Sequence, residues 1–179
     1  MILSFISAVA VLSLSYVFVD SALHKFSAPQ HFRAALENYR VVPEGLLRPL
    51  GQSLPLLEIT LGIALLIPAA REFALPGMVF LLSAYTAGML INIQRGRVDI
   101  DCGCNGPARS EGISLWLVGR NVGLVMMAGW VGYFSTLLPT SLGTWSLALA
   151  STVVFIFFYH SLTQLRTNNK LQQKVHNHV

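Results

Sequence analysis

Two cysteines, Cys102 and Cys104, are the residues best suited to chemistry in this sequence, and the chain holds no others. They flank Gly103 in a polar segment, where a thiol gains little by acting as a small apolar side chain. A disulfide between residues two apart closes a very small ring, and glycine supplies the backbone freedom that such a ring needs. A strained, exposed bond of this kind is easily reduced. The pair therefore favours exchange with another protein over a structural staple.

The spacing leaves two other interpretations open. A zinc site would need two further ligands, which His24 and His31 could supply, although the sequence has no second closely spaced ligand pair. The pair could also be an incidental feature of the loop. Asp99 and Asp101 disfavour a nearby thiolate and Arg109 favours one, so the sequence does not decide which cysteine attacks.

The composition of the chain indicates the structure that must position these cysteines. Hydrophobic residues make up 54% of the 179 residues, charged residues make up 11%, and the mean hydropathy is +0.60. A soluble domain usually has about 25% charged residues, so the sequence predicts an integral membrane protein. The formal charge of +4 comes from 12 basic residues, mostly between the apolar stretches. These charges bear on orientation in a bilayer and do not support nucleic-acid binding.

Five apolar stretches predict membrane-spanning helices. Because lipid offers the backbone no hydrogen-bond partners, these stretches must be helical. We expect an all-α polytopic bundle of about five transmembrane helices, with one domain over residues 1–165. A polar tail over residues 166–179 is expected to be frayed helix or disorder. The expected spans are residues 2–19, 54–70, 73–93, 113–138 and 142–159.

Two longer connections are expected on the same side of the membrane. In residues 20–53, Phe32, Leu36 and Tyr39 recur at helical spacing until Pro43 breaks the run, which predicts a short helix at the membrane surface. Residues 94–112 contain four glycines and one proline around the cysteines. This composition predicts tight turns rather than a long helix.

Ionisable residues inside the spans form a second group of candidate site residues. A charge near the bilayer centre is costly unless it has a partner, and Glu58 and Arg120, with Asn121 beside it, lie inside the second and fourth spans. We expect Glu58 to pair with Arg120, unless each side chain only snorkels or caps its helix. A polar cluster below the cysteines could relay protons. Its further members would be Tyr85, Asn92 and Gln94. The alternative role for each of these three residues is to anchor its helix at the membrane interface.

These motifs together resemble a known family. They are similar to the methylamine utilisation protein MauE family and, in the first part of the chain, to the DoxX membrane family. The resemblance covers about residues 15 to 130, and its Cys-Gly-Cys part is the most specific. The residues that carry it are His24-Lys25, Phe32, Leu36, Tyr39, Pro43, Pro55, Glu58, Asp101-Cys102-Gly103-Cys104-Asn105-Gly106, Ile113-Ser114 and Arg120-Asn121.

The resemblance implies a four-helix core plus one additional helix, and a role in maturing methylamine dehydrogenase, whose small subunit needs many disulfides. The implied partner is a thioredoxin-like protein, MauD, with the dehydrogenase small subunit as client. A second likeness, to the vitamin K epoxide reductase bundle, implies quinone as electron carrier, but it holds at fold level only because this chain has Cys-x-Cys instead of Cys-x-x-Cys. The expected function is thiol-disulfide exchange. The alternatives are a non-catalytic assembly factor and a metal-binding membrane protein.

Charge and chemistry predict opposite orientations. Ten basic residues are expected on the cysteine side, against Arg71 on the other, and this excess favours the cytoplasm for the cysteines. Disulfide chemistry for a periplasmic client requires the opposite side. We expect a multi-pass protein of the bacterial inner membrane with the cysteine loop in the periplasm. The ten residues are Lys25, Arg33, Arg40, Arg48, Arg95, Arg97, Arg109, Arg166, Lys170 and Lys174.

Overall fold

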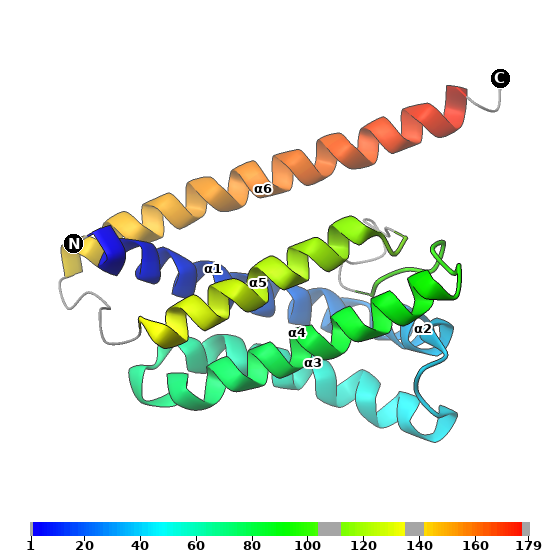
Figure 1. Cartoon of the computed structure of the whole chain (residues 1–179), viewed down its shortest axis with the longest axis horizontal. Coiled ribbons are helices and arrows are strands. Elements are labelled where there is room, and N and C mark those ends of the chain that lie inside the picture. The colour runs from blue at the N-terminus through cyan, green and yellow to red at the C-terminus, as the bar shows by residue number, and fades with distance from the viewer. Residues whose placement is uncertain (1, 104–111, 135–141, 177–179) are drawn as a thin grey trace.

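The structure is a computed structural model that describes residues 2–103, 112–134 and 142–176. The described chain folds into α-helices and contains no strand (Figure 1). The elements are α1 (Ile2–Ser27), α2 (Pro29–Tyr39), α3 (Glu44–Leu66), the 3-10 turn η1 (Pro68–Ala70), α4 (Arg71–Gln94), α5 (Leu115–Tyr133) and α6 (Leu142–His176). The predicted all-α class is confirmed.

In the part of the chain that the structure describes, four helical segments are long and apolar enough to cross a membrane, namely Ile2–Ser27, Glu44–Leu66, Pro68–Gln94 and Leu115–Tyr133. They make this a multi-pass membrane protein. The apolar part of α6, Gly143–Phe158, is shorter than these four. The polar stretch after it continues as helix to His176.

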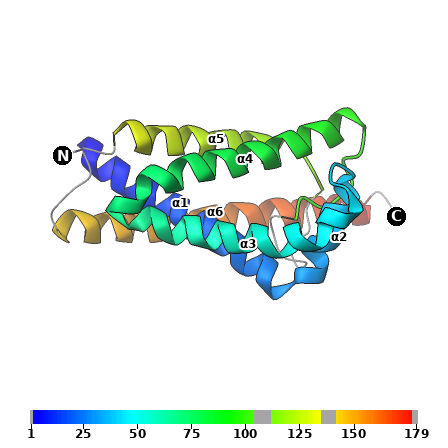
Figure 2. The same ribbon diagram turned by 90° about the horizontal axis from the view of Figure 1, so that it is seen from below.

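The four long helices form a bundle in which α1 and α4 each pack against both α3 and α5, so α3 and α5 lie on opposite sides (Figure 2). Alternating chain direction brings α2, the start of α3 and the segment after α4 to one end (Figure 1). α6 packs along α1. The bundle core is made of apolar side chains that include Val11, Leu14, Leu65, Met78 and Val131.

Two helices begin or end further out than the apolar stretches predicted. α1 continues past residue 19 to Ser27, because Ala22 and Lys25 on its last turns are buried against the bundle. α3 begins at Glu44 and contains both Pro49 and Pro55. The surface helix predicted around Phe32 is confirmed as α2, which has Pro29 in its first turn and buries Phe32.

Candidate functional site

Cys102 is buried, with 7% of its surface exposed. It packs with Met89 of α4 and with Ile113 and Leu117 at the start of α5. The expectation that this cysteine would lie exposed in a polar loop is therefore wrong. The reason is tertiary, because the segment folds back between two spans and α2 covers it. Cys104 and Arg109 lie outside the described residues.

The segment that carries Cys102 is joined by backbone contacts, just before the cysteine, to the residues that precede α5. Asp101 and Gly112 form an isolated antiparallel bridge, and the Ile113 amide donates to the Ile100 carbonyl at 3.0 Å. Gly103 has φ +71°, and a Cβ at this position would lie 3.1 Å from the Cβ of Ala35 on α2. Glycine is therefore needed both for the backbone conformation and for the close approach of α2.

Three contacts hold α2 over Cys102. The Tyr39 hydroxyl donates to the Cys102 carbonyl at 3.3 Å. The fully buried side chain of Asn92, on α4, donates to the Tyr39 carbonyl at 3.1 Å. His31 lies 3.5 Å from the carboxylate of Asp101, which also accepts from the Gly103 amide at 2.7 Å. Asp99, by contrast, is exposed.

Replacing Asn92 with alanine should loosen α2 and expose Cys102. The change removes the hydrogen bonds to the Tyr39 and Gly88 carbonyls, and a lost buried hydrogen bond costs about 1–3 kcal/mol. Local opening should become roughly 5- to 150-fold more frequent. The rate of maleimide labelling of Cys102, measured in a Cys104→Ser background, checks this. Asn38→Ala, an exposed change on α2, is the control and should leave the rate unchanged. Equal rates for Asn92→Ala and Asn38→Ala would show that Asn92 does not hold α2.

Glu58 lies at the centre of a buried polar cluster. The Lys25 ammonium and the Tyr85 hydroxyl both donate to its Oε1 atom, the hydroxyl at 2.7 Å. Glu58 and Lys25 are 2% and 4% exposed. The ammonium also donates to Ser21 at 3.1 Å and lies 4.8 Å from the centre of the Tyr85 ring and 5.0 Å from that of Phe32. Ring faces attract a cation, so both aromatic residues help to hold this charge.

The structure gives Glu58 a different ion-pair partner from the one that the sequence predicted. Lys25 takes the place expected for Arg120, because Arg120 is on α5, which lies across the bundle from α3, whereas Lys25 is on neighbouring α1. Sequence reasoning missed Lys25 by ending the first helix at residue 19. The signal that could have found Lys25 was the position of Glu58 inside a span, because a buried carboxylate needs a nearby cation. Asn121 is buried on α5, and Gln94 is exposed.

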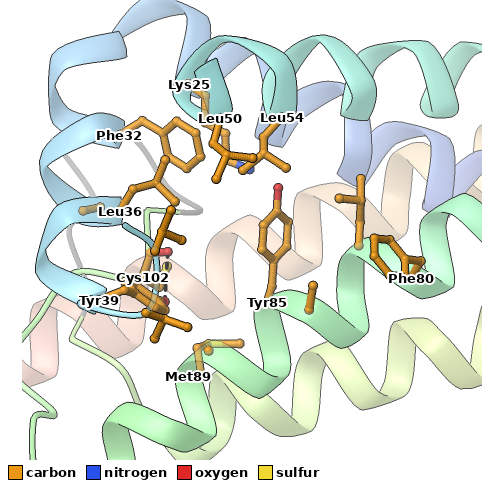
Figure 3. A pocket seen from close by; sticks show the side chains of 16 residues that line it. Lys25, Phe32, Leu36, Tyr39, Leu50, Leu54, Phe80, Tyr85, Met89 and Cys102 are labelled. Carbon is orange, nitrogen blue, oxygen red and sulfur yellow. Dashed lines mark hydrogen bonds between the residues drawn. The ribbon is translucent and has the colours of Figure 1, made fainter. Parts of the chain in front are cut away.

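A cavity of about 330 Å³ lies between α2, α3 and α4 and reaches Cys102. We call it the thiol cavity. Most of its lining is apolar, and its polar contributors are Lys25, Tyr39, Tyr85 and Cys102. Figure 3 shows Tyr85 pointing from α4 toward Lys25, with Phe32 and Tyr39 on the wall formed by α2. The structure thus brings the cysteine and the polar cluster, two separate groups in the sequence, to one cavity.

The family model described as methylamine utilisation protein MauE matches residues 3–134. The chain belongs to the MauE family. It is 32% identical to a methylamine utilization protein MauE of Paracoccus versutus over 151 residues, which cover 82% of this chain and 80% of that relative. It is 30% identical to a protein of the same name from Methylorubrum extorquens over 146 residues, covering 82% of this chain and 76% of the relative. No solved structure matches the chain.

The MauE match includes Lys25, Glu58, Tyr85 and Cys102 and ends before α6 begins. All residues of the buried polar cluster therefore lie in the part of the chain that the family shares. The predicted family is confirmed.

Proposed function

We propose that this chain is a membrane thiol-disulfide redox protein of methylamine utilisation that acts through Cys102 and Cys104. The proposed partner is the thioredoxin-like protein MauD, and the proposed client is the small subunit of methylamine dehydrogenase. The observation that carries the proposal is that Cys102 lies in the wall of a cavity with a buried ion pair at another wall. A cysteine incidental to a loop would not need such surroundings.

The proposed step is disulfide exchange. A thiolate of the reduced partner attacks the Cys102–Cys104 disulfide and forms a mixed disulfide, which the second thiol of the partner resolves. The partner leaves as a disulfide that can oxidise the client, and this chain is left with two thiols. Both electrons then pass from these thiols to a carrier in the membrane. Because α2 covers Cys102, the partner must displace α2 or approach through Cys104.

Trapping the mixed disulfide tests this function. Cells that carry either Cys102→Ser or Cys104→Ser are expected to accumulate a covalent adduct with the thioredoxin-like partner in one of the two variants. The remaining thiol of this chain attacks the disulfide of the oxidised partner, and the chain has no second thiol to release that partner. The adduct should disappear on reduction and should be absent from the Cys102→Ser/Cys104→Ser double variant, which is the control. Absence of the adduct from both single variants would contradict the proposed exchange.

The burial of Cys102 beneath α2 favours a second function, a non-catalytic assembly factor that docks the partner and the client. The two functions differ in what the double serine variant does. An assembly factor would still support maturation of the dehydrogenase without either thiol. A redox protein would not.

We also propose that this end of the bundle faces the periplasm, with the protein in the bacterial inner membrane. The structure weakens the opposing charge argument in one respect, because Lys25 is neutralised by Glu58 inside the bundle and does not belong to the loop charges. Arg33 on α2 and Arg40 at its end can contact anionic headgroups of either leaflet.

A single exposed cysteine should reveal the orientation. Val98, 43% exposed after α4, is changed to cysteine in the Cys102→Ser/Cys104→Ser background, because native Cys102 is too buried to label well. A membrane-impermeant maleimide is expected to label it in intact spheroplasts. Glu72→Cys, exposed at the opposite end of α4, should be labelled only after lysis. The reverse pattern would place the cysteine segment in the cytoplasm.

A further inference from the structure

We propose that the thiol cavity binds a membrane quinone through its ring and carbonyl oxygen, and that this quinone accepts the electrons of the cysteines. The inference rests on the proposed function, because only a thiol-disulfide cycle supplies those electrons. Three features of the cavity point to a quinone. They are its apolar lining, the Lys25 ammonium group in that lining, and its access from the lipid.

The lining of the thiol cavity suits a flat apolar ring. Its volume, about 330 Å³, lies in the range of small-ligand pockets, about 300–1,000 Å³. Phe32, Tyr39 and Tyr85 contribute aromatic rings to its walls, and Leu50, Leu54 and Met89 are among the aliphatic residues. Cofactors with phosphate groups would find no charge to match there. Among the described residues that line the cavity, the one cation is Lys25, and Glu58 already neutralises it.

Lys25 can hold a neutral carbonyl oxygen. An ammonium group has three hydrogens to donate, and the described acceptors, Ser21 and Glu58, use two. The third is available to an acceptor in the cavity that Lys25 lines. A carboxylate ligand such as a fatty acid would be repelled by Glu58, whereas a neutral carbonyl would not. The Glu58 Oε2 atom is buried and has no hydrogen-bond partner within the described part of the chain, so the cluster also offers a base beside the ammonium.

Access to the cavity is from the lipid. Phe80 lines the cavity on α4, within the span Pro68–Gln94, and its side chain is 72% exposed. A residue so placed in a membrane-spanning helix faces the bilayer. The ligand is therefore expected to be lipid-soluble. A quinone combines this property with a carbonyl oxygen and the capacity to take up two electrons.

The reaction balances without another reactant. The thiols of Cys102 and Cys104 lose two protons and two electrons, and a sulfur–sulfur bond forms between them. The quinone takes up the same two electrons and two protons, which convert both carbonyl groups to hydroxyl groups. Glu58 and Lys25 are placed to pass protons toward the bound oxygen, and Cys102 lines the same cavity.

Binding of decylubiquinone to the full chain in lipid nanodiscs tests the proposal. Saturable binding above that of empty nanodiscs is expected. Ala84→Phe adds a ring to the cavity wall and should weaken binding at least about 10-fold, as expected when a ligand loses its space. Ala87→Phe, on the same helix but outside the lining, is the matched control and should bind like the native chain.

A second arm tests the carbonyl contact. The double variant Lys25→Met/Glu58→Gln avoids an unpaired buried charge and should lose about 10-fold in affinity for decylubiquinone. Decylbenzene has the ring and the tail but no carbonyl oxygen. It should bind to the native chain more weakly than decylubiquinone does, whereas the double variant should bind the two compounds equally. Equal affinity of the native chain for both compounds would overturn the proposal and make the cavity a site for apolar chains.

Cys102→Ser separates this proposal from the function on which it rests. The variant should lose client maturation, which is compared with decylubiquinone binding measured on the native chain. If the native chain fails to bind decylubiquinone while Cys102→Ser still abolishes maturation, the quinone site is wrong and the redox function stands. If binding is present while Cys102→Ser matures the client normally, the redox function fails, and with it the quinone's role as electron acceptor.

Discussion

Glu58→Gln is expected to destabilise the bundle by about 3–5 kcal/mol, because it leaves the Lys25 ammonium buried without its counter-charge. Lys25 and Glu58 have side chains that are each 3% exposed, so water cannot replace the lost partner. Lys25→Met should lower the free energy of unfolding by a similar amount, since it leaves the buried Glu58 carboxylate without its counter-charge. Unfolding of the purified protein in mixed micelles, followed by circular dichroism, measures the free energy.

The double variant Lys25→Met/Glu58→Gln should recover more than about 1 kcal/mol of the sum of the two losses, since it removes both charges together. Glu37→Gln provides a matched control, because Glu37 is exposed on α2 and its change should stay within about 0.5 kcal/mol. Strict additivity of the two single changes would mean that Lys25 and Glu58 do not interact.

Cys102→Ala should reduce maturation of methylamine dehydrogenase to background while the protein still inserts and folds. Without the Cys102 sulfur the chain cannot form the disulfide that the thiolate of the reduced partner attacks. Alanine is chosen because Cys102 packs among Met89, Ile113 and Leu117, where a serine hydroxyl would add the cost of a buried polar group. Dehydrogenase activity and the amount of its small subunit are measured in cells.

Cys102→Ser serves as a comparison, and it should lose maturation equally although it differs from alanine in polarity. Membrane content of each variant, measured by immunoblot, shows whether the chain is present. If the dehydrogenase matures to the native level in the Cys102→Ala strain, Cys102 has no part in the proposed function.

Much of the fold could be predicted from local sequence. The membrane class follows from composition, and the spans follow from apolar stretches of sufficient length. The helix α2 could be predicted from the spacing of Phe32, Leu36 and Tyr39. The ends of α1 and α3 could not be, because polar residues such as Lys25 extend a helix when the tertiary structure gives them a buried partner.

The candidate site divides in the same way. Residue type and position alone identified the two cysteines and Glu58. They also identified Tyr85 as one of three further candidates for the polar cluster. The burial of Cys102, the pairing of Glu58 with Lys25 and the thiol cavity depended on which helices are neighbours.

The sequence by itself determined that this is a helical membrane protein with a cysteine pair between two spans, because lipid forces each apolar stretch to satisfy its own backbone. Only the tertiary structure decided that α3 lies beside α1 and across from α5. It likewise decided that α2 closes over Cys102. Apolar helices of similar length can pack in many orders, and hydropathy does not distinguish these orders. The choice depends on contacts such as the Lys25–Glu58 ion pair and the close approach of Ala35 to Gly103, which join residues far apart in the chain.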